Sequence, residues 1–135
     1  MRIAVVALSE KKSEQLTKIA HAVGREFSAM GQHCDVMTAG GSGLSGYDFL
    51  VFCSDSASVA TVKNNRLSQL LASSGMLVGK RSMALLVAKG FFRNKKLGRY
   101  MSLLEKEGLI LTMAELISNE AEAVAAARGA PLVRG

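Results

Sequence analysis

Short apolar runs and helical repeats alternate along this chain. The apolar runs cover residues 3–8, 34–37, 49–53, 82–88 and 109–113. Most of them show no polar alternation and contain β-branched residues, as expected of strands buried on both faces of a parallel sheet. Between the runs, apolar residues recur every three or four positions, which is the spacing of an amphipathic helix. This alternation predicts a parallel sheet with helices on both faces.

The first strand and the first helix give the strongest pattern. Residues 3–8 lead through Ser9-Glu-Lys-Lys-Ser13 into a helix. Its predicted apolar face consists of Leu16, Ile19, Ala20, Val23, Phe27 and Met30. Ser9 or Ser13 is expected to cap the start of this helix, and Gly31 to end it in a left-handed conformation. The turn between strand and helix would lie at the carboxyl end of the sheet, where ligands of open α/β folds bind.

The later elements are predicted from the same signals. His33 and Asp35 favour an edge position for the second strand, and four glycines in residues 39–46 predict a flexible connection that is too short for a helix. Turn and cap residues follow the third strand at 54–58. Helices are then expected at 59–73, before Gly108, and from a capping box of Asn119 and Glu122 to about Arg128.

We therefore expect one α/β domain over residues 1–135, built as a three-layer α/β/α sandwich. Right-handed crossovers leave few strand orders for a five-stranded parallel sheet, and 2-1-3-4-5 is one of them. In this order the first strand separates Cys34 from Cys53. Two strand spacings are about 9.5 Å, which exceeds the roughly 7 Å between Cα atoms that a disulfide spans. No intramolecular disulfide is expected.

Composition and charge restrict the kinds of partner and the kinds of chemistry that are expected of this chain. The formal net charge is +6 and the pI is about 9.6, which favours anionic partners. No apolar run approaches the roughly 20 residues that span a bilayer, and no signal-peptide pattern is evident; a cytoplasmic location and no membrane contact are expected. His21 and His33 are predicted at the surface, and no zinc-ligand spacing appears. The pattern favours an electron carrier or a binding protein over an enzyme.

Three stretches carry a resemblance to the flavodoxin family, and the resemblance extends over nearly the whole chain. They are Arg2–Ile19, Tyr47-Asp48 with the apolar strand and Ser54, and Gly79-Lys80-Arg81 with the following strand, helix and Gly108. The resemblance implies FMN binding and electron transfer. In flavodoxins the first turn wraps the FMN phosphate, because hydroxyls and N–H groups at a helix N-terminus meet the anion where the helix dipole is positive.

The resemblance also implies which residues would bind FMN. They are Ser9, Lys11, Lys12 and Ser13 in the first turn, Ser54, Asp55 and Ser56 after the third strand, and Phe91 and Phe92 after the fourth. Structural alternatives exist in two of these loops: helix capping for Ser9 and Ser13, a solvated surface for Lys11 and Lys12, and packing under the next helix for Phe91 and Phe92.

This chain departs from the family pattern at two loops. The first turn has no glycine and carries Glu10. The second loop has neither the proline nor the aromatic residue of the family, so one of the two surfaces that stack on the flavin ring is missing. Asp55 would place a carboxylate near an electron-rich ring and oppose its reduction.

The charge pattern leaves a second interpretation open. Flavodoxin electron carriers are mostly acidic, but here five cations without an acidic residue occur at Lys89, Arg93, Lys95, Lys96 and Arg99. The alternative is a flavin-free module whose basic rim binds another anionic ligand or an acidic redox partner protein. Nucleic-acid binding is not favoured, because no binding motif accompanies the cations and aromatic residues make up only 5%.

Two further expectations concern related folds and self-association. A receiver domain has the same strand order, but it needs paired acids after the first strand and an aspartate at the end of the third. This chain has Ser9-Glu10 and Cys53 at those places, so a functional receiver domain is not expected.

A homodimer is expected if the fifth strand is a poorly covered edge with an apolar surface. That surface would consist of Met83, Met101, Leu109 and Met113.

Overall fold

The computed structural model describes residues 1–9, 13–38, 41–55, 66–88 and 93–132, and the side chains of 66–68 are outside this description. Its five parallel strands are β1 (Arg2–Ala7), β2 (His33–Met37), β3 (Phe49–Asp55), β4 (Arg81–Val87) and β5 (Ile110–Ile117). They form one sheet in the order β2-β1-β3-β4-β5. The predicted parallel sheet and its flavodoxin-like order are confirmed, and β2 is an edge strand as expected.

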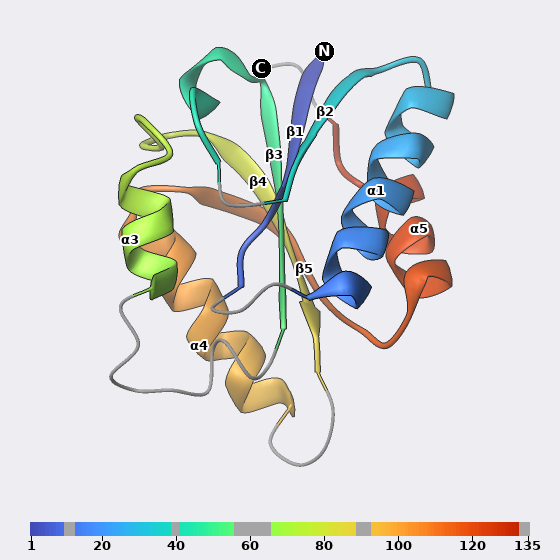
Figure 1. Cartoon of the computed structure of the whole chain (residues 1–135). Coiled ribbons are helices and arrows are strands. Elements are labelled where there is room, and N and C mark those ends of the chain that lie inside the picture. The colour runs from blue at the N-terminus through green and yellow to red at the C-terminus, as the bar shows by residue number, and fades with distance from the viewer. Residues whose placement is uncertain (10–12, 39–40, 56–65, 89–92, 133–135) are drawn as a thin grey trace.

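Helices cover both faces of this sheet, which confirms the three predicted layers. Figure 1 shows α1 (Glu14–Ala29) and α5 (Glu120–Arg128) side by side on one face, and α3 (Arg66–Ala72) and α4 (Arg93–Lys106) on the other. Each face has its own core. Phe49, Val51 and Cys53 of β3 pack under α1 and α5, whereas Leu50 and Phe52 pack in the core that includes α4, because side chains alternate along a strand.

The predicted helix ends are confirmed at three positions. The N–H of Leu16 donates to the Ser13 hydroxyl oxygen at 3.2 Å at the start of α1. Gly31 follows this helix with φ +84°. At α5, the N–H of Glu122 donates to the Asn119 side chain at 2.9 Å. The apolar face of α1 is buried as predicted except for Met30, which is 38% exposed, because the helix ends at Ala29 and the chain turns away from the core.

Two strands differ from their predicted extents by more than one residue. Ser54 and Asp55 were expected in a turn, but they continue β3 and pair with Leu86 and Val87 of β4. The fifth strand continues to Ile117, four residues beyond the prediction. It lies at the edge of the sheet, where half-exposed positions accept polar residues, so its sequence does not show a continuous apolar run. Of the helix predicted at 59–73, the structure describes α3.

The described part of the glycine-rich connection, residues 41–46, is anchored to the body of the protein. It contains one short turn, η1 (Leu44–Gly46), and the Leu44 side chain is fully buried. The Lys80 ammonium donates to the backbone oxygens of Ser45 at 2.7 Å and Tyr47 at 2.6 Å. A segment whose composition predicts flexibility is thus held in place by a lysine from the start of β4.

Two expectations about pairing and surfaces have different outcomes. Cys34 pairs with Ile3 and Cys53 with Ala7, at opposite ends of β1, and both thiols are free as predicted. Met83 and Leu109 are buried. The prediction that they form an apolar surface at the fifth strand is therefore wrong, since their side chains fill the cores under the helices.

Among the described helices, none has the length and apolar character needed to cross a bilayer.

Candidate functional site

The carboxyl edge of the sheet brings together the starts of two helices and the end of a central strand. Parallel strands all end at the same edge, which is the lower edge in Figure 1. Ser9 follows β1, Ser13 caps α1, Ser54 and Asp55 end β3, and Arg93 begins α4. The other predicted site residues, Lys11, Lys12, Ser56, Phe91 and Phe92, lie outside the described residues.

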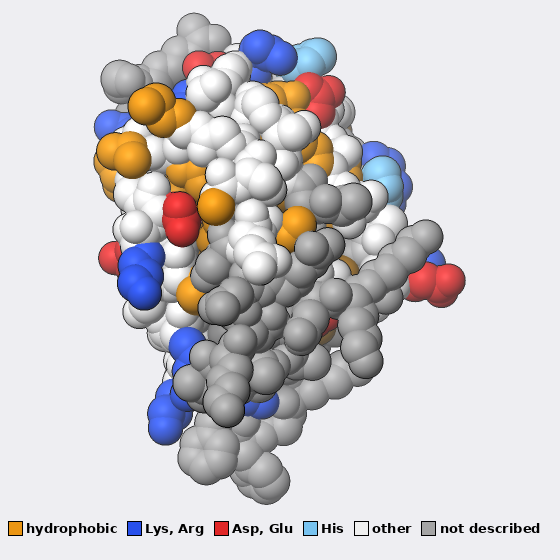
Figure 2. All heavy atoms as spheres, turned by 60° about the vertical axis from the view of Figure 1, so that its left-hand side comes forward, with side chains coloured by type: hydrophobic (Ala, Val, Ile, Leu, Met, Phe, Trp, Pro, Cys, Tyr) orange, Lys and Arg blue, Asp and Glu red, His pale blue; other side chains and the backbone are white. Residues whose placement is uncertain are grey.

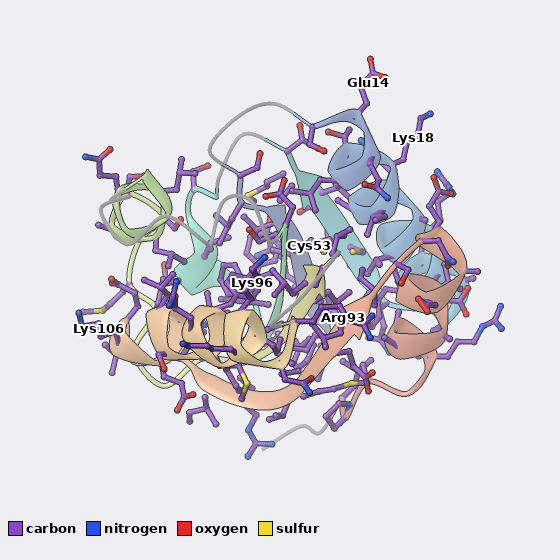
Figure 3. All side chains as sticks on the ribbon, turned by 90° about the horizontal axis from the view of Figure 1, so that it is seen from below. Glu14, Lys18, Cys53, Arg93, Lys96 and Lys106 are labelled. Carbon is purple, nitrogen blue, oxygen red and sulfur yellow. The ribbon has the colours of Figure 1, made fainter. Side chains whose placement is uncertain are left out.

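The start of α1 offers hydrogen-bond donors to an anion. The first N–H groups of a helix have no acceptor within the helix, and the helix dipole is positive there. The Ser13 oxygen accepts from the Leu16 N–H, so the capping alternative is realised, yet its hydroxyl hydrogen can still be donated. Glu14 is exposed in the first turn; Figure 3 shows Glu14 and Lys18 pointing outward from α1.

The start of α4 is basic. Its first turn has no acidic residue, Arg93 and Lys95 are exposed, and Lys96 is half-buried. Figure 3 shows Arg93 at the beginning of this helix and Lys106 at its far end. In Figure 2, several Lys and Arg side chains lie along the lower left of this face, and others lie near its top. We call Arg93, Lys95 and Lys96 the basic surface; Lys89, predicted with them, lies outside the described residues.

A hollow at the same edge differs in charge from the basic surface. It is open, has a volume of about 490 Å³ and lies between the starts of α1 and α5. Glu14 and Glu120 line it together with Asn119 and Lys18. Two carboxylates beside one cation make this hollow less suited to a phosphate than the opposite side of the edge, where the basic surface begins.

Two buried hydroxyls lie on the α4 side of β3. The side chains of Ser54 and Tyr100 are both 0% exposed, and neither hydroxyl has a hydrogen-bond partner in the described structure. Burial, and then the charges of Cys53 and Asp55, raise the pKa of Tyr100 well above its usual value. A tyrosine at a core position of a predicted helix is itself a signal in the sequence, because buried phenols usually have a hydrogen-bond partner.

The described residues provide little for acid–base or metal chemistry. Among them, no group of three or more His, Cys, Asp and Glu could hold a metal ion. His21 and His33 are exposed, as predicted. His33 pairs with Arg2 at the amino end of β1, far from the carboxyl edge, and lies 3.6 Å from the Asp35 carboxylate.

The two thiols are expected to react slowly at neutral pH. Burial raises the pKa of Cys53 to about 12, and burial together with Asp35 raises the pKa of Cys34 to about 11. At pH 8 the thiolate fraction of Cys34 is then about 100-fold lower than at a pKa of 9, and its reaction rate should rise about tenfold per pH unit. Both shifts stabilise the fold below pH 9, and this stability is lost as the pH rises toward 12.

Labelling with a thiol reagent between pH 7 and 10 measures this directly. A Cys34→Ser variant keeps only Cys53, which should react only as the protein unfolds. Rapid labelling of the native wild-type protein at pH 7 would contradict the expected protection.

Comparisons with known proteins agree with this architecture. No protein-family model matches the sequence, and no curated protein matches it at a significant level. Among solved structures, the two-electron reduced flavodoxin of Megasphaera elsdenii matches with a TM-score of 0.70 and 12% identity, over 95% of this chain and 99% of that one.

Two further flavodoxins give similar values. A mutant flavodoxin from Pseudomonas aeruginosa has a TM-score of 0.69 and 12% identity, over 96% of this chain and 95% of its own. A flavodoxin from Streptococcus pneumonia has a TM-score of 0.61 and 15% identity, over 95% of this chain and 92% of its own. At these identities the similarity concerns the backbone and its topology, and it shows that the chain has the flavodoxin-like fold.

Proposed function

We propose that this chain binds FMN at the carboxyl edge of its sheet and serves as an electron carrier. The observation that carries the proposal is the convergence, at the edge where ligands of such folds bind, of the start of α1 and the Ser54 end of β3. The Ser54 hydroxyl is buried without a partner. The flavodoxins with this fold support the choice of ligand.

The described residues fit the phosphate end of FMN. The N–H groups at the start of α1 and the hydroxyls of Ser9 and Ser13 would hold the phosphate, and Lys96 and Arg93 would offset its charge. When bound, FMN supplies the redox chemistry, and the protein positions and tunes it. The carboxylate of Asp55 at the end of β3 would oppose the arrival of negative charge and so lower the reduction potential.

A visible spectrum followed by an FMN titration tests this proposal. We expect saturable quenching of FMN fluorescence with the wild-type chain. Ser13→Asp should weaken FMN binding about tenfold or more, because its carboxylate repels the phosphate, while aspartate still caps the helix. Asn119→Asp is the matched control: it makes the same charge change at the cap of α5, beside the acidic hollow, and should alter FMN affinity less than about twofold.

A wild-type protein that is colourless and ignores FMN at high micromolar concentration would contradict the proposal. The basic surface would then favour the alternative function, a flavin-free module that binds another anionic ligand or an acidic redox partner protein. Binding of such a partner should weaken steeply as salt is raised, because exposed charges are screened.

A further inference from the structure

The two tyrosines of this chain differ in the hydrogen bonding of their hydroxyls. The Tyr47 hydroxyl donates to the Asp35 carboxylate at 2.6 Å, near the amino edge. The Tyr100 hydroxyl is buried and has no partner in the described structure. A buried hydroxyl without a partner is costly, and phenylalanine would fill the same space without that cost. The phenol of Tyr100 therefore calls for an explanation beyond packing.

The second unpartnered hydroxyl, that of Ser54, belongs to the same layer. Leu50 and Phe52 of β3 face the core that contains Tyr100. Ser54 lies two residues further along the strand and so faces the same side. Cys53 and Asp55, the neighbours of Ser54, are close enough to influence Tyr100 electrostatically. Both hydroxyls thus lie between the carboxyl end of β3 and α4.

This layer faces the carboxyl edge of the sheet, where the site is proposed. Tyr100 projects from α4, and helical side chains lean toward the N-terminus of their helix, which here is at the carboxyl edge (Figure 1). The start of α1 and the basic surface offer groups for a phosphate, but they offer nothing specific to the neutral part of a ligand. The hydroxyls of Ser54 and Tyr100 are neutral and can both donate and accept.

We propose that Ser54 and Tyr100 form a second, neutral binding site for the flavin, whose uncharged oxygen and nitrogen atoms supply the hydrogen bonds that these hydroxyls lack. This inference rests on the proposed function and names two residues that recognise the part of the ligand beyond the phosphate. The effect of removing either hydroxyl should therefore be independent of the phosphate.

The test compares Tyr100→Phe and Ser54→Ala with the matched control Tyr47→Phe. Without flavin, Tyr100→Phe should raise the melting temperature by about 3 °C or more, because an unpartnered hydroxyl is removed. It should weaken the binding of FMN and of riboflavin equally, by about 5- to 10-fold. Ser54→Ala should also weaken the binding of both flavins. Ser13→Asp should affect FMN alone, since riboflavin has no phosphate.

Tyr47→Phe should do the opposite. It removes a satisfied hydrogen bond, so the melting temperature should fall, and flavin affinity should stay within about twofold of the wild-type value. This control separates the loss of a hydroxyl in general from the loss of one that serves the ligand.

Three outcomes would overturn the inference, and they can be told apart. A lower melting temperature of flavin-free Tyr100→Phe would show that the hydroxyl is already satisfied within the protein. Unchanged flavin affinity in both variants, with a binding wild type, would reject the neutral site and leave the proposed function intact. Failure of the wild type to bind FMN and riboflavin would reject both.

Discussion

Replacing Gly108 with alanine is expected to lower the free energy of unfolding by about 2–5 kcal/mol. Gly108 ends the turn after α4 with φ +88°, a left-handed conformation that costs a residue with a side chain about 1–2 kcal/mol. An added Cβ would also come within 2.9 Å of the Val78 Cα and 2.8 Å of its Cγ2. Because one of these atoms belongs to the backbone, the contact cannot be relieved by a side-chain rotation, and overpacking adds about 1–3 kcal/mol.

Gly31→Ala is the matched control for this prediction. Gly31 has nearly the same φ, +84°, but an added Cβ would meet no atom within 4 Å. We therefore expect a loss of only about 1–2 kcal/mol, which is the cost of the left-handed conformation. Urea unfolding of both variants gives the comparison. Equal losses would show that the close approach of Val78 and Gly108 contributes nothing to stability.

Lys80→Met is expected to cost about 2 kcal/mol and to loosen the η1 turn. The substitution keeps a long apolar side chain but removes both hydrogen bonds from the ammonium to the backbone oxygens of Ser45 and Tyr47. Hydrogen bonds from charged donors contribute about 1.5–3 kcal/mol, and part of this is screened at a half-exposed site. Amide hydrogen exchange should accelerate at Leu44–Tyr47 and stay unchanged in the central strands.

Lys106→Met controls for the loss of a positive charge. Lys106 is exposed in the last turn of α4, and its substitution should change stability by no more than about 0.5 kcal/mol. If Lys80→Met and Lys106→Met had equal effects, or if exchange in Lys80→Met rose uniformly, the lysine would not be the anchor of this turn.

The architecture could be predicted from the amino-acid sequence alone, because the signals for strands and helices are local. A short apolar run without alternation indicates a strand buried on both faces, and an apolar residue every three or four positions indicates the inner face of a helix. Ser13, Asn119 and Gly31 mark helix ends through their own side chains or, for glycine, the lack of one. Together with the handedness of crossovers, these signals left few strand orders, and the observed order 2-1-3-4-5 is one of them.

The pairing of residues at the carboxyl edge and the partners of their hydrogen-bonding groups could be read only from the folded structure. Ser54 and Asp55 look like turn residues, but pairing with β4 makes them part of a strand. Lys80 anchors the glycine-rich connection across 35 residues of sequence. The shared layer of Ser54 and Tyr100 likewise depends on how α4 packs on the sheet. Hydrogen bonding between distant segments leaves no periodic signal in the sequence, so these features appear only once the chain is folded.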